Sequence, residues 1–69
     1  MITTGAGVLH LDTFRVGWAL FKELKHGLPY WRVRLATETP EYMWFRESGL
    51  DLFPDAGPCP EPTPSAQGI

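Results

Sequence analysis

The chain has 69 residues and a formal net charge of −2, which is enough for one small domain only. Chains of this size bury a modest core, so association with a second copy is a reasonable expectation. A single cysteine and two histidines supply neither an internal disulfide nor the ligands of a structural metal site, and we expect no cofactor. Since no apolar run is long enough to cross a bilayer and the start lacks the features of a secretory signal, we expect a cytoplasmic protein.

Positive and negative charges balance before Pro54, where six acids meet six bases, and two later acids supply the net charge. A protein that binds the phosphate backbone of nucleic acids usually carries a basic excess or stripe. The composition therefore lowers the expectation of nonspecific nucleic-acid binding without excluding it.

Composition divides the chain into three parts. The start, MITTGAG over residues 1–7, is expected to be a flexible N-terminus. Residues 8–53 hold most of the apolar side chains and are the expected folded unit. Residues 54–69 contain five prolines and little to bury, which predicts a disordered proline-rich tail.

Residues 12–28, DTFRVGWALFKELKHGL, are compatible with two kinds of element. A helix over 13–26 would begin at Asp12 as its N-cap and end at Gly27, with Gly17 in its interior at a cost of about 1 kcal/mol. A strand would alternate apolar residues at even positions from 14 to 20 with the residues between them, and Gly17 would mark a bend or bulge. The local pattern leaves both open.

Two runs rich in aromatic and branched residues, 30–36 and 41–46, predict an antiparallel hairpin. Residues directly opposite one another share a face, so parity restricts the register. Placing Val33 opposite Met43 makes one face wholly apolar, whereas a shift by one residue would mix arginines with Phe and Met on both faces and bury charge. The favoured register has a loop of odd length and gives these pairs: Trp31 with Phe45, Arg34 with Tyr42, Arg32 with Trp44, and Tyr30 with Arg46.

On the outward face of this hairpin, arginines and aromatic rings alternate across the strands. A guanidinium over a ring stabilises an exposed sheet by roughly 0.5–1 kcal/mol, so the pairs have a structural explanation. The same composition is typical of binding hot spots, and an exposed aromatic cluster on a small domain usually has something to cover it. The sequence leaves both interpretations open.

Two stretches resemble the small SH3-like barrels, the group that includes SH3, Tudor and KOW-type domains. The segment TFRVGWAL at 13–20 is similar to their common opening, with Trp18 where the group has an acidic residue. The segment MWFRESGLDLF at 43–53 is similar to their closing pattern of a strand, a tight turn and a short last strand. The resemblance implies an all-β fold, a five-stranded SH3-like barrel, in which 14–24 is a strand.

In such a barrel the strands curl around one core, which consists of the side chains that face inward. We expect this core to contain Phe14, Val16, Leu20, Trp31, Val33, Leu35, Met43, Phe45, Leu50 and Leu52. If 13–26 is instead a helix, the fold becomes an α+β arrangement of the order β-α-β-β with the helix on the hairpin.

No segment carries a recognisable catalytic signature, because the glycines are scattered and His10 with Asp12 lacks a nucleophile and an oxyanion site. We expect a noncatalytic module, a small regulatory or adaptor protein that binds another protein, with nucleic-acid binding through the same face as the alternative. Self-association through this face is a third hypothesis. The expected partner-binding residues are Trp18, Tyr30, Arg32, Arg34, Tyr42, Trp44 and Arg46.

Overall fold

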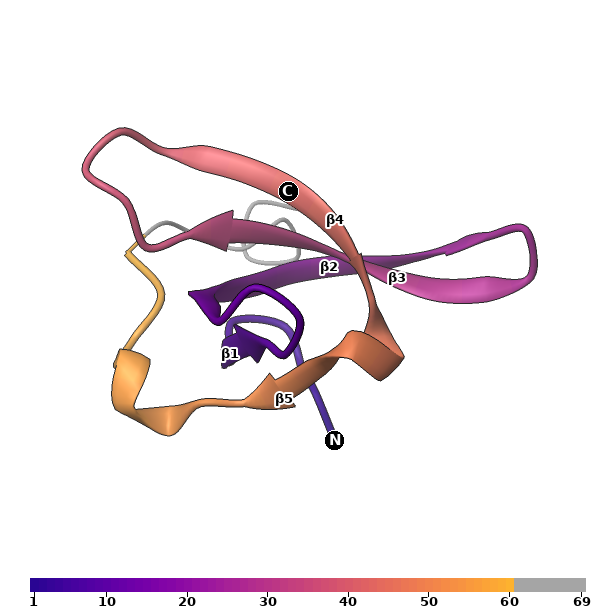
Figure 1. Cartoon of the computed structure of the whole chain (residues 1–69), viewed down its shortest axis with the longest axis horizontal. Coiled ribbons are helices and arrows are strands. Elements are labelled where there is room, and N and C mark those ends of the chain that lie inside the picture. Colours follow the sequence, from indigo (N-terminus) through magenta and orange to yellow (C-terminus); the bar gives the residue numbers. More distant parts are fainter. Residues whose placement is uncertain (61–69) are drawn as a thin grey trace, which may run out of the picture.

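The computed structural model describes residues 1–60, and within them it shows an antiparallel sheet of five strands and no α-helix (Figure 1). The expected all-β class is confirmed. The 61–69 part of the expected tail lies outside the described residues. The elements are β1 (Gly7–His10), β2 (Arg15–Lys25), β3 (Leu28–Leu35), β4 (Glu41–Arg46) and β5 (Leu50–Leu52), with 3-10 turns η1 (Glu47–Gly49) and η2 (Pro54–Ala56).

The strands lie in the order β4-β3-β2-β1-β5, with β4 and β5 at the two edges. Strand β2 is the longest and pairs with both β1 and β3, so the helix alternative over 13–26 is wrong. A bulge between Ala19 and Phe21 gives β2 one extra residue, which bends the strand and shifts the phase of its alternation. The predicted bend near Gly17 therefore falls two to three residues further along.

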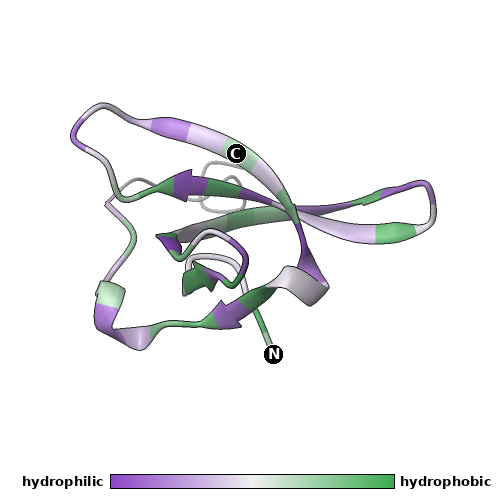
Figure 2. Cartoon of the chain, viewed as in Figure 1, coloured by the Kyte–Doolittle hydropathy of each residue, from purple (hydrophilic) through white to green (hydrophobic). Residues whose placement is uncertain are grey.

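The hairpin of β3 and β4 has the predicted register at every predicted pair, including Val33 opposite Met43 and Trp31 opposite Phe45. Its loop covers the five residues between Leu35 and Glu41, an odd length as expected. Figure 2 shows hydrophilic and hydrophobic residues alternating over the second half of β3, the pattern of a strand with one face toward the core.

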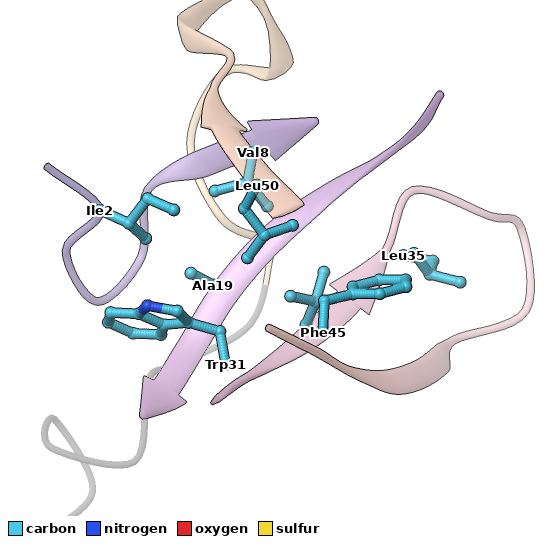
Figure 3. Packing of buried hydrophobic residues seen from close by; sticks show 8 residues of the cluster. Ile2, Val8, Ala19, Trp31, Leu35, Phe45 and Leu50 are labelled. Carbon is cyan, nitrogen blue, oxygen red and sulfur yellow. The ribbon is translucent and has the colours of Figure 1, made fainter. Parts of the chain in front are cut away.

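The core lies on the face that carries Trp31, Val33, Leu35 and Phe45. Figure 3 shows Trp31, Leu35 and Phe45 gathered with residues from β1, β2 and β5. Ile2, Val8 and Ala19 belong to this core, although the sequence pattern did not select them. Ile2 lies outside the 8–53 range that we expected to fold.

Three expected core residues are exposed, and a fourth, Val16, is only half-buried. Phe14 is 75% exposed because it precedes β2 in a turn, with a φ of 57°. Met43 and Leu52 lie on the two edge strands, where no further strand covers them.

The end of the expected folded unit and the start of the expected tail both pack against the sheet, where η2 contacts β1 and β2. The Phe53 N–H donates to the Gly7 carbonyl at 2.8 Å, and η2 follows directly. A side chain at Gly7 would meet the Phe53 carbonyl oxygen at 2.5 Å, so this close approach requires glycine. Within residues 1–60, the structure contains no helix that could span a membrane.

Candidate interaction surface

The outward face of the sheet is assembled from directly opposed residues on three strands. Arg32 of β3 has Trp44 of β4 on one side and Phe21 of β2 on the other. Neighbouring rows are built in the same way, because residues that are directly opposite share a face. We call this surface the arginine–aromatic face, and its residues are Trp18, Phe21, Glu23, Lys25, Leu28, Tyr30, Arg32, Arg34, Tyr42, Trp44 and Arg46.

The structure brings all seven predicted site residues onto this face. Phe21, Glu23 and Lys25 were missed because the bulge moves the second half of β2 to the opposite phase. Leu28 was missed because β3 begins two residues before the predicted run 30–36. Simple alternation from Trp18 would place Phe21 on the core side. Only Gly17 hinted at an irregularity nearby.

Trp44 lies at the centre of the ring contacts. The Lys25 ammonium is 4.2 Å from the centroid of its ring and the Arg32 guanidinium is 5.4 Å from it, while Phe21 meets it edge to face at 5.5 Å. Trp44 is consequently half-buried and held in place by its own neighbours. A pre-positioned ring of this kind loses little conformational entropy when a partner covers it.

Tyr42 is the more open aromatic residue, with 40% of its surface exposed. The Arg32 guanidinium lies 5.6 Å from the centroid of the Tyr42 ring, so Arg32 bridges two rings of β4. Cross-strand contacts between arginine and aromatic residues are therefore present, as predicted. Arg34 lies 5.8 Å from the centroid of the Trp18 ring, a contact that the hairpin register did not predict.

Trp18 is on the predicted face but is only 8% exposed, so the expectation that it forms part of an open patch is wrong. Its indole N–H donates to the Gly57 carbonyl at 3.1 Å, which places the chain after η2 over this end of the face. In this state Trp18 supports the surface and does not offer its ring to a partner.

Charge is sorted between the arginine–aromatic face and the other described residues. The face carries four bases (Lys25, Arg32, Arg34, Arg46) and one acid (Glu23), a net charge of +3. The other described charged residues are two bases and six acids, a net charge of −4. The arginine–aromatic face is therefore strongly positive, although the charges of the whole chain nearly cancel.

A hollow of about 390 Å³ lies beside the second half of β4. Tyr30, Trp44 and Arg46 line it from the arginine–aromatic face. The rest of its lining is Phe45, His10, Asp12, Ser48 and Gly49. The hollow combines apolar rings with a guanidinium, as binding surfaces for peptide side chains do.

His10 serves the fold and does not form a pair with Asp12. Its ring stacks on Phe45 with centroids 3.9 Å apart, and its Nδ1 is 2.8 Å from the Thr13 hydroxyl oxygen.

On the core side of the sheet, the Trp31 indole N–H donates to the Glu47 carboxylate at 2.8 Å. Among residues 1–60, no three or more His, Cys, Asp or Glu side chains are grouped in a way that could hold a metal ion.

Comparison with known proteins gives no relative: no family model matches the chain, and neither a curated protein nor a solved structure matches it.

Proposed function

We propose that this protein is a noncatalytic interaction module, a small regulatory or adaptor protein of the cytoplasm that binds an acidic segment of another protein. The observation that carries this proposal is the sorting of charge, with +3 on the arginine–aromatic face against −4 at the other described positions. Such sorting attracts and orients a partner of opposite charge. A sheet stabilised by its own packing does not require it.

The aromatic side chains supply the second part of the recognition. Tyr42 is exposed and Trp44 is half-buried, and both lie beside Arg32. Trp, Tyr and Arg are the residue types most enriched in binding hot spots, because a ring offers apolar area and a guanidinium offers donors to carboxylates. We assign Trp44 and Tyr42 as anchors, and Arg32, Arg34 and Arg46 as donors to carboxylates of the partner.

We also propose that the fold is an SH3-like barrel. The support is the strand order β4-β3-β2-β1-β5, the bulge in β2 and the single 3-10 turn between β4 and β5. These features agree with the resemblance of the opening and closing segments. The sheet topology alone carries no function.

Nucleic-acid binding through the same face is the second candidate. The interleaving of guanidinium groups with rings favours it, because bases stack on aromatic side chains while arginines contact phosphates. A direct comparison of the two kinds of ligand separates the candidates.

The test uses fluorescence anisotropy with two labelled probes in 150 mM salt. One probe is a 12-residue peptide of alternating Glu and Leu, and the other is a 12-nucleotide single-stranded DNA. We expect the peptide to bind more tightly, and Arg32→Gln to weaken its binding about tenfold, since a charged hydrogen bond contributes about 1.5–3 kcal/mol.

Arg15→Gln is the matched control, because Arg15 is a half-exposed arginine whose guanidinium lies near Glu41 and Met43, away from the arginine–aromatic face. Equal losses in the two variants would show that the peptide responds to overall charge and would contradict the proposal. Tighter binding of the DNA would favour the second candidate.

A further inference from the structure

Strand β4 is an edge of the sheet, and its backbone pairs on one side only, with β3. The six residues Glu41–Arg46 contain no proline, and charged residues stand only at their two ends. Proteins usually block an edge of this kind, since its unpaired N–H and C=O groups are a template for another strand. The middle of β4 is open and apolar, and Met43 is 38% exposed.

We propose that a second copy of this chain pairs with β4, antiparallel and across a two-fold axis, with Trp44 opposite Trp44 of the second copy. When the two-fold axis is perpendicular to the sheet, the arginine–aromatic faces of both copies lie on the same side. A residue of β4 can therefore stand opposite only those residues of the second copy that belong to the same face. In this register Tyr42 stands opposite Arg46 of the second copy, and Met43 stands opposite Phe45 of the second copy.

Two neighbouring registers obey the same parity but fit less well. A centre at Met43 would place Glu41 opposite Phe45 of the second copy, which sets a carboxylate against an apolar ring. A centre at Phe45 would pair only the last three residues of β4. The centre at Trp44 pairs the whole stretch from Tyr42 to Arg46, and within this stretch the only charged residue, Arg46, stands opposite the Tyr42 ring, which can accept a cation–π contact.

The proposed register continues the alternation that already exists between β3 and β4. Across β4, Arg34 stands opposite Tyr42, and Tyr30 stands opposite Arg46. Adding the second copy extends the row from Arg34 and Tyr42 to Arg46 and then Tyr30 of that copy, so each guanidinium has a ring on both sides. Cation–π contacts of this kind contribute roughly 0.5–1 kcal/mol each at exposed sites.

The hollow beside β4 gives the second copy a place to bury side chains. Trp44, Phe45 and Arg46 line this hollow of about 390 Å³, and they are the residues that Tyr42 and Met43 of the second copy would approach. In this register Glu41 would stand opposite Glu47 of the second copy, and each of the two carboxylates has a cation of its own chain beside it. The Glu41 carboxylate oxygen is 3.6 Å from the Arg15 guanidinium nitrogen, and the Glu47 carboxylate oxygen is 3.7 Å from the Lys22 ammonium nitrogen. A small chain also gains stability from such an interface.

Site-specific crosslinking tests both the association and its register, in the 69-residue chain with Cys59→Ser. Directly opposite Cβ atoms lie about 4.5–5.5 Å apart, close to disulfide geometry, so Trp44→Cys should crosslink under mild oxidation. Tyr42→Cys should not, because the two copies of position 42 are offset by four residues, about 14 Å. Absence of crosslinking at position 44, or equal crosslinking at both positions, would overturn the proposal.

Sedimentation equilibrium of the unmodified chain at 100 µM provides the second measurement, with a dimer mass expected and a monomer mass contradicting it. Met43→Lys should shift the mass toward the monomer, whereas Leu24→Lys should not, although Leu24 is 72% exposed, because it lies in the β2–β3 hairpin away from β4. Equal effects of the two substitutions would also overturn the proposal. Met43 is not on the arginine–aromatic face, so loss of the dimer with peptide binding retained separates this proposal from the proposed function.

Discussion

At the scale of the residue, Gly17 is the position where the backbones of β2 and β3 leave no room for a side chain. A Cβ there would collide with the Arg34 carbonyl oxygen and would lie 2.8 Å from a methyl group of Val33. We expect Gly17→Ala to lower the free energy of unfolding by about 1–3 kcal/mol, the usual cost of overpacking. Urea unfolding followed by tryptophan fluorescence measures it.

Gly49→Ala is the matched control, because its Cβ would meet the His10 ring no closer than 3.7 Å, an ordinary contact. The control should change stability by less than about 0.5 kcal/mol. Similar losses at both positions would show that the close approach at Gly17 is not what requires glycine.

Residue parity predicted which hairpin side chains share a face, because pairing of directly opposite residues depends only on local alternation. The burial of Trp18 could not be predicted in this way. The group that covers it is the carbonyl of Gly57, which is 39 residues away in sequence. No local pattern links these positions, and the proline-rich composition after Pro54 favoured a tail without contacts.

At the scale of the element, the turn between β2 and β3 depends on two residues with positive φ. His26 has a φ of 55° and Gly27 has a φ of 79°, while Lys25 and Leu28 pair on either side. Two central residues with positive φ are the pattern of a type I′ turn, which prefers Asn-Gly. His26→Asn should therefore raise the melting temperature slightly.

His26→Val should lower the melting temperature by about 4–8 °C, because a branched residue in the left-handed region costs roughly 1 kcal/mol or more. Differential scanning calorimetry of the two variants tests the turn. A valine variant as stable as the wild type would mean that the hairpin does not use this turn in solution.

The type of β2 and the position of its bulge could not be predicted from the local sequence pattern. The type of β2 was decided by the resemblance, since periodicity allowed both a helix and a strand. Its bulge between Ala19 and Phe21 was not located, and as a result Phe21 and Lys25 were missing from the predicted site. A bulge satisfies tertiary curvature more than local preference, so the flanking residues give little sign of it.

At the scale of the whole molecule, one sheet separates two kinds of side-chain chemistry. Apolar side chains from all five strands gather on one side, and four of the six bases stand on the other. The three tryptophans report on this separation independently. Trp44 is in the middle of the arginine–aromatic face, Trp18 is covered at its end, and Trp31 is buried on the core side.

The most direct test of the arginine–aromatic face as the binding surface is a titration with the acidic peptide, observed through the three indole N–H resonances in a ¹H–¹⁵N correlation spectrum. We predict that the Trp44 resonance moves progressively with added peptide while the Trp31 resonance, held by Glu47, stays in place. A spectrum in which Trp31 moves as far as Trp44, or in which Trp44 does not move at saturating peptide, would contradict the account.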